Sequence, residues 1–306
     1  MIVKLSMADE TGLRPAASRR SRTTAAVARV AAADAMNGAA TKANGASIND
    51  NNLHHDYKIG AGQFELGASN EKMNIIGPEL VSTFDMLRAS HRFYFEKDKV
   101  IDIGCGPGLL MMPLLTHGIN VEGFDPTEEM IQSARASLEG AVFGDGKDKN
   151  KVKLTNSIDT LAKESYAAGM LNFVTQTCET KKELKTLFQQ AHGLIKDGGV
   201  LIVTGAHPEH LHFKHANCEY DVEDSSKMVD GQRYTGRIIS DRGTAIYHLS
   251  GDYFWHLRTM QKVAEGVGFV HEDTRKIADK GTYVRKASPV PPYFMMTLRR
   301  NGIHPK

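Results

Sequence analysis

The fold is indicated by residues 100–110, which read Val100-Ile101-Asp102-Ile103-Gly104-Cys105-Gly106-Pro107-Gly108-Leu109-Leu110. An apolar segment of strand character runs into three glycines at alternate positions, and a segment of helical character follows. Glycine permits a sharp turn of the backbone and lets a ligand approach the main chain closely. The start of the helix then offers free N–H groups. This stretch therefore predicts a strand, a ligand-binding turn and a helix.

Strand and helix patterns alternate on both sides of this turn. We expect helices over residues 70–92, 109–116, 126–138, 182–195 and 252–267. We expect strands over residues 99–103, 120–124, 152–155, 171–175, 200–204, 269–277 and 293–299. Such alternation predicts an α/β fold with a doubly wound, mostly parallel sheet. Ligands of these sheets bind outside the carboxyl ends of the strands, so the residues just after each strand are the informative ones.

An acid follows the second strand of the pattern. Asp125 stands 21 positions after Gly104 (125 − 104), near the roughly 20 expected for an acid that binds the ribose hydroxyls of an adenosine. Dinucleotide enzymes use Gly-x-Gly-x-x-Gly with a pyrophosphate at the helix start. Here the spacing is Gly-x-Gly-x-Gly, and Asp102 precedes it. A carboxylate there repels a pyrophosphate and suits an amino group, which argues against NAD.

Three segments together resemble class I S-adenosylmethionine-dependent methyltransferases. Residues 102–108 are similar to the first motif of that family, residues 123–131 to the segment after its second strand, and residues 194–202 to the helix, turn and strand before its substrate loop. The resemblance covers about residues 70–300. It implies a seven-stranded, Rossmann-like sheet with an antiparallel final hairpin. It also implies the cofactor S-adenosyl-L-methionine and a small-molecule methyl acceptor, whose methylated O, N, S or C atom stays undetermined.

The resemblance assigns roles to individual residues. The glycine turn would surround the methionine part of the cofactor, with Asp102 at that end, and Asp125 would bind the ribose hydroxyls. Many relatives carry an Asp after the third strand that bonds the adenine amino group, whereas this chain has Asn156-Ser157-Ile158. The candidate cofactor residues are Asp102, Gly104, Cys105, Gly106, Gly108, Asp125, Pro126, Met130, Asn156, Ser157, Ile158 and Gln176.

The methyl acceptor is expected under residues 207–250. This long, polar segment begins right after the fifth strand, and loops of its length in compact domains tend to be functional lids. It contains a predicted β-hairpin around Asp241-Arg242-Gly243. Since methyl transfer depends mainly on holding the reactants in line, a dedicated base is needed only where the acceptor must lose a proton. Candidate bases are His207, His210 and His256, and candidate substrate contacts are Tyr234, Tyr253 and Trp255.

Other interpretations of these residues stay open. The histidine-rich loop after the fifth strand is also compatible with a polar surface loop or, with Cys218, a zinc site, although its spacing fits no standard site. Aromatic residues at helical spacing also suit a core, and the hairpin also suits a subunit contact. For the whole chain, the alternatives are an enzyme that uses NAD or a nucleotide sugar, and a non-catalytic cofactor-binding protein with the same fold.

Composition sets the remaining limits. The chain has 306 residues, with 38 Lys and Arg against 36 Asp and Glu, so no strong charge favours a nucleic-acid partner. Apolar runs stay far below the roughly 18 residues of a membrane span. Three widely spaced cysteines indicate a reducing compartment and no disulfide framework, which predicts a cytoplasmic protein. We expect no metal, and a monomer or a homodimer.

The first 48 residues differ from the rest of the chain. They are rich in Ala, Ser, Thr and Arg and poor in acids. This composition is typical of a disordered tail or of a transit segment for a plastid or a mitochondrion. The expected organisation is therefore a tail over residues 1–48 and one methyltransferase domain over residues 49–306, with 207–250 as an inserted lid.

Overall fold

The computed structural model describes residues 74–139, 152–213, 218–239, 245–278 and 291–302. Side chains of residues 238–239 and 245–250 are outside this description. The predicted tail over residues 1–48 and the hairpin turn at 241–243 also lie outside the described residues. Within the described part of the chain, no helix has the length and apolar character needed to cross a membrane.

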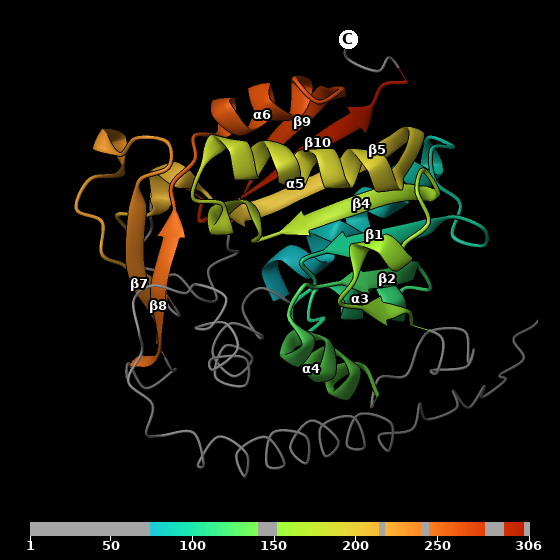
Figure 1. Cartoon of the computed structure of the whole chain (residues 1–306), viewed down its shortest axis with the longest axis horizontal. Helices are drawn as coiled ribbons and strands as arrows, with labels where there is room; N and C mark the ends of the chain where they lie inside the picture. The colour runs from blue at the N-terminus through green and yellow to red at the C-terminus, as the bar shows by residue number, and fades with distance from the viewer. Residues whose placement is uncertain (1–73, 140–151, 214–217, 240–244, 279–290, 303–306) are drawn as a thin grey trace, which may run out of the picture. The chain divides into compact units, whose positions relative to one another are not determined.

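A seven-stranded sheet forms the centre of the fold (Figure 1). Its order is β3-β2-β1-β4-β5-β10-β9. The first five strands run parallel, and β10 is antiparallel to both of its neighbours, β5 and β9. The strands are β1 (Lys99–Ile103), β2 (Asn120–Phe124), β3 (Leu154–Thr155), β4 (Tyr166–Asn172), β5 (Ile195–Ala206), β9 (Phe269–Ile277) and β10 (Tyr293–Arg300). The doubly wound α/β fold and its antiparallel final hairpin are confirmed.

Helices cover both faces of this sheet. They are a helix over residues 74–89, α3 (Met111–Thr116), α4 (Glu128–Glu139), α5 (Lys181–Leu194) and α6 (Leu257–Glu265). Side chains along the strands alternate between two hydrophobic clusters, as the pleat requires. One cluster joins Val100, Met170 and Ile202 to helix 74–89 and α3. The other joins Ile101, Leu171 and Val203 to α5 and α6, which lie together in front of the sheet in Figure 1.

Three predicted elements have clearly different boundaries. The fifth strand spans Ile195–Ala206 and not 200–204. The fourth strand spans Tyr166–Asn172 and not 171–175. Its first residues, Tyr-Ala-Ala-Gly-Met, are mostly small and have weak strand propensity, but all are buried at the centre of the sheet, where packing overrides propensity. The late helix begins at Leu257 and not at residue 252. Asp252 and Tyr253 belong to the preceding strand β8, and His256 stands at the N-cap position of the helix.

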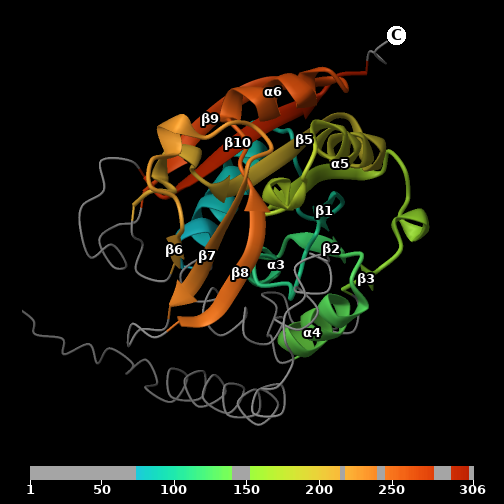
Figure 2. The same cartoon turned by 60° about the vertical axis from the view of Figure 1, so that its left-hand side comes forward.

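A second sheet contains three antiparallel strands in the order β6-β7-β8. These are β6 (Cys218–Tyr220), β7 (Arg233–Ile239) and β8 (Ala245–Tyr253), so the predicted hairpin is confirmed. A small hydrophobic cluster of Leu211, Met228, Tyr234 and Phe254 supports it. In Figures 1 and 2 the hairpin lies beyond the carboxyl ends of β4 and β5. The segment after the fifth strand thus faces the edge where ligands of such sheets bind.

The start of α5 offers a test of local stability. Thr180 Oγ1 accepts the Glu183 N–H at 3.2 Å, and Glu183 Oε2 accepts the Thr180 N–H at 3.4 Å. Because Thr180→Ala removes this capping box, we expect the free energy of unfolding to fall by about 1 kcal/mol. Thr186→Ala, at an exposed position in the same helix, is the control and should be neutral or slightly stabilising. Urea denaturation followed by circular dichroism measures both, and equal effects of the two variants would contradict the assignment.

Candidate functional site

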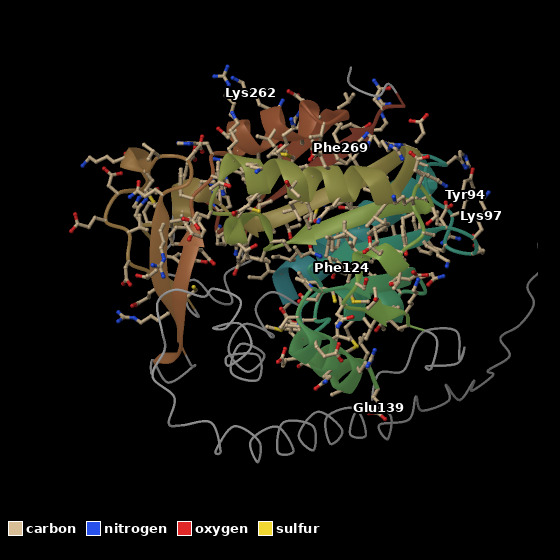
Figure 3. All side chains as sticks on the ribbon, viewed as in Figure 1. Tyr94, Lys97, Phe124, Glu139, Lys262 and Phe269 are labelled. Carbon is tan, nitrogen blue, oxygen red and sulfur yellow. The ribbon has the colours of Figure 1, made fainter. Side chains whose placement is uncertain are left out.

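The glycine turn joins β1 to α3 at the carboxyl edge of the sheet. Gly104 and Gly106 adopt left-handed conformations, with φ of +74° and +52°. A Cβ on Gly104 would come within 2.6 Å of Val174 Cγ2, whereas one on Gly106 would face open space. Both Gly104 N–H and Cys105 N–H donate to the carbonyl of Phe124 at the end of β2, a residue labelled in Figure 3. The third glycine, Gly108, also has positive φ.

Asp125 connects the turn to the start of α4. Its Oδ2 accepts the Gly106 N–H and its Oδ1 accepts the Thr127 N–H, both at 2.9 Å. The side chain is buried, and its negative charge strengthens both hydrogen bonds. In this structure Asp125 therefore shapes the backbone around the turn, in addition to the ribose contact predicted for it.

Asp102 is almost completely buried, with 1% of its surface exposed. Its Oδ1 accepts a hydrogen bond from Asn172 Nδ2 at 3.0 Å, and Asn172 Oδ1 accepts one from Thr204 Oγ1 at 2.8 Å. Burial raises the pKa of Asp102 to about 7, the Asn172 hydrogen bond opposes this rise, and the negative charge of Asp125 adds to it. Among the described residues, no cationic side chain contributes to these surroundings. Side chains from the ends of β1, β4 and β5 are thus joined by hydrogen bonds at Asp102, and no positively charged described residue accompanies this carboxylate.

The remaining cofactor candidates lie in different surroundings. Cys105 is buried and points toward β2, because a Cβ on Gly123 would come within 2.9 Å of its Sγ. Burial raises the pKa of this thiol well above its usual range. Met130 is buried, Pro126 is exposed, and the exposed Asn156 donates to Glu128 Oε2 at 2.8 Å. The two residues that follow Asn156 are half-buried: Ser157 and Ile158.

Four of the predicted site residues line one pocket. They are Gln176 in the turn after β4, Tyr234 in β7, Tyr253 at the end of β8 and Trp255 in the link to α6. The other lining residues are Thr175, Ala206, Pro208, Leu211, Phe254, Met260 and Phe294. None of these described residues carries a charge. Tyr234 and Trp255 are also buried, and Trp255 Nε1 donates to the Cys178 carbonyl at 2.9 Å, so they serve the core as well as the pocket.

The three candidate histidines do not form a cluster. His207 and His210 are both buried directly after β5, and neither lines the pocket, although Ala206 and Pro208 do. Burial lowers the pKa of His207, with the charge of Lys276 acting in the same direction and that of Glu209 opposing it. His256 is half-exposed at the start of α6, where its Nδ1 lies 2.9 Å from Asp230 Oδ1. Within the described ranges, no three His, Cys, Asp or Glu residues are placed to hold a metal ion.

Sequence reasoning missed Asn172, Phe173 and Thr204. Asn172 was placed inside a strand, but it is the last residue of β4. Phe173 follows it in a left-handed conformation with φ of 58°, which is costly for an aromatic residue. Its N–H donates to the Thr204 carbonyl at 2.9 Å. Correct strand ends would have identified this position, because ligand-facing residues follow the strands.

Known proteins match the chain over a limited segment. The mitochondrial ubiquinone biosynthesis O-methyltransferase of Homo sapiens is 30% identical over 106 residues, which make up 35% of this chain and 28% of that enzyme. The ribosomal protein L11 methyltransferase of Bacillus licheniformis is 28% identical over 122 residues, or 39% of this chain and 35% of that enzyme. The match thus spans only about a third of each of these relatives.

Solved structures and a family model extend the comparison to most of the described fold. Magnesium protoporphyrin IX methyltransferase from Synechocystis PCC 6803, solved with bound SAM, has a TM-score of 0.52 and 16% identity, and the match covers 84% of this chain and 100% of that one. A S-adenosylmethionine-dependent methyltransferase from Clostridium acetobutylicum has a TM-score of 0.50 and 15% identity, with 72% and 91% covered. The family model described as "Methyltransferase domain" matches residues 82–270, more than half of the chain. The chain therefore belongs to the methyltransferase-domain family.

Proposed function

We propose that the protein transfers a methyl group from S-adenosyl-L-methionine to a small-molecule acceptor. The observation that carries the proposal is the pair of acids, Asp102 and Asp125, at adjacent strand ends beside the glycine turn. Their surroundings hold no positive counterpart to Asp102 in the described residues. S-adenosylmethionine brings a sulfonium and an ammonium group, whose charges suit this end of the sheet. The pyrophosphate of NAD would be repelled there.

The residues of the turn are our candidates for holding this cofactor. Asp102 and the backbone of Gly104, Cys105, Gly106 and Gly108 would bind its methionine end. Asp125 would accept the ribose hydroxyls, as an acid after the second strand of such a sheet does. Around the adenine we place Met130, Asn156, Ser157 and Ile158. Pro126 and Gln176 are further candidate cofactor contacts, and Gln176 also lines the pocket.

The acceptor would enter the pocket below the hairpin. Its lining is aliphatic and aromatic without a charged side chain, and polar groups come from Thr175, Gln176, Tyr234 and Tyr253. Such a lining suits an uncharged small molecule and offers nothing to the phosphates of a nucleic acid. The name of the human relative includes an O-methyltransferase activity in ubiquinone biosynthesis, which supports a small-molecule acceptor. We therefore propose Tyr234, Tyr253 and Trp255 as acceptor contacts.

His207 suits a donor role better than that of a base. Its Nδ1 accepts the Glu209 N–H at 3.3 Å, which places the proton of the neutral ring on Nε2. Nε2 is buried and has no hydrogen-bond partner among the described residues. This nitrogen would therefore donate to an oxygen rather than remove a proton. His210 and His256 stay as candidate bases for an acceptor that must lose a proton.

The location and assembly of the protein are also proposals. We place it in the cytoplasm as a monomer or a homodimer. The alternative is a plastid or mitochondrial location, directed by residues 1–48, and the name of the human relative includes the word mitochondrial. Mass spectrometry of the N-terminus of the protein isolated from cells distinguishes a retained segment from a cleaved one.

Cofactor binding tests the proposal directly. In calorimetry the protein should bind S-adenosylmethionine and its demethylated product S-adenosylhomocysteine, and it should show no heat with NAD. Methyl transfer is then tested by incubating the protein with a metabolite extract and isotope-labelled S-adenosylmethionine, with heat-inactivated protein as the control. Mass spectrometry should find a labelled small molecule. Tight NAD binding without a response to S-adenosylmethionine would contradict the proposal.

The raised pKa of Asp102 predicts a conflict between stability and binding. Because its pKa is about 7 in the folded protein and 3.8 ordinarily, its ionisation destabilises the fold progressively as the pH rises from 4 to 7. Asp102→Asn should therefore stabilise the ligand-free protein by roughly 2–3 kcal/mol more at pH 8 than at pH 5, while weakening the binding of S-adenosylmethionine. Denaturation at both pH values measures this. Asp159→Asn at an exposed position is the control, and a gain independent of pH would refute the assignment.

The hairpin should affect the acceptor more than the cofactor. Shortening it between Arg233 and Leu249 should abolish turnover, because Tyr234 and the cover over the pocket are lost. Affinity for S-adenosylmethionine should stay within a few-fold, since no proposed cofactor residue lies in β7 or β8. Release of S-adenosylhomocysteine in the metabolite extract and a cofactor titration measure the two effects. If the hairpin is a subunit contact instead, light scattering will show a change of mass, and full activity of the shortened protein would exclude a lid.

A further inference from the structure

A chain of side-chain hydrogen bonds crosses the three central strands at their carboxyl ends. It runs from Thr204 on β5 through Asn172 on β4 to Asp102 on β1, with donor–acceptor distances of 2.8 and 3.0 Å. All three residues are buried. Asn172 and Thr204 are also register partners in the sheet, and Phe173 adds its N–H bond to the Thr204 carbonyl. The backbone pairing of β4 and β5 therefore holds Asn172 and Thr204 in fixed positions relative to each other.

The hydroxyl of Thr204 determines which way the Asn172 amide faces. It donates to Oδ1 of the amide, so the NH₂ group is turned toward Asp102. With the amide reversed, its oxygen would face the carboxylate and repel it. Thr204 thus acts on Asp102 through Asn172, without touching it.

One oxygen of the Asp102 carboxylate is available to accept a hydrogen bond from a ligand. Asn172 donates to its Oδ1, and no described residue donates to its Oδ2. The titratable groups that interact with Asp102 are Asp125 and the Cys105 thiol, and neither supplies a positive charge. A buried carboxylate with a free oxygen and no cation is expensive to maintain unless a ligand completes it.

We propose that Asn172, oriented by Thr204, is a positioning residue that keeps the Asp102 carboxylate charged and aligned for the ammonium group of the cofactor. The inference rests on the proposed cofactor and adds to it a pair of residues outside the glycine turn. Neither residue needs to contact the cofactor. Their effect should be confined to ligands that carry the amino-acid end.

Two ligands separate this role from a general structural one. S-adenosylmethionine carries the amino-acid end, whereas 5′-methylthioadenosine lacks it and shares the adenosine part. Thr204→Val removes the hydroxyl and keeps the shape of the side chain. We expect its affinity for S-adenosylmethionine to fall about fivefold to tenfold, while its affinity for 5′-methylthioadenosine stays within about twofold. The loss should be larger at pH 6.5 than at pH 8.5, because a weakened Asn172 donor raises the pKa of Asp102 further.

Three further variants complete the test. Thr204→Ser keeps the hydroxyl and should restore wild-type affinity. Asn172→Ser removes the donor directly, and it should reproduce the selective loss even if Thr204→Val fails to fold. Thr297→Val makes the same change on β10 at a half-buried position and should leave both affinities unchanged. Calorimetry with wild type and variants at the two pH values gives all of these numbers.

The outcomes are distinguishable from one another. Equal weakening of both ligands, or unchanged binding of S-adenosylmethionine by Thr204→Val and Asn172→Ser, overturns the inference and leaves the proposed function intact. A wild-type protein that binds neither ligand overturns the proposed function itself. Selective, pH-dependent loss supports both.

Discussion

One buried carboxylate holds together the two turns on which the site depends. Asp125 accepts main-chain N–H groups from the glycine turn and from the first residues before α4. These contacts fix a backbone that contains left-handed glycines and that packs against Val174. A carboxylate can do this because it accepts several hydrogen bonds at once, and charge-assisted bonds are the stronger ones. These bonds join the turn after β1 to the end of β2 and the start of α4, beside the strand that carries Asp102.

The fold was predictable where apolar periodicity and glycine act locally. β1 and β2 have the bounds that the sequence predicts, because each ends on an apolar residue directly before a turn residue, Gly104 or Asp125. β4 was misplaced, since its small residues become a strand only through burial between β1 and β5. The start of α6 was also misplaced, because β8 extends through Tyr253 to pair with β7. In both cases contacts distant in sequence decided the boundary.

The residues of the site also divide into those that the sequence identifies and those that only the fold brings together. The glycines and Asp125 follow strands, Asp102 stands two positions before the glycine turn, and Tyr234 lies in the long segment after the fifth strand. Tyr234, Tyr253 and Trp255 were expected near an acceptor, and they line a common pocket with Gln176. The partners of Asp102 could not be found this way. Asn172 is 70 residues from it and Thr204 another 32, so only the parallel pairing of three strands brings them together. Orientation of a side-chain amide likewise depends on a partner that the sequence does not identify.

The place of β10 has a consequence for the synthesis of the chain. β9 is made before β10, but among the described strands its one neighbour in the sheet is β10, which separates it from β5. Until residues 293–300 have left the ribosome, β9 lacks its partner among the described strands, and β5 presents an open edge. Chains fold from the N-terminus as they emerge, and an unpaired strand edge invites pairing with other chains. The edge of β5 thus stays open to pairing with other chains until β10 is inserted, and the same strand brings Phe294 to the pocket.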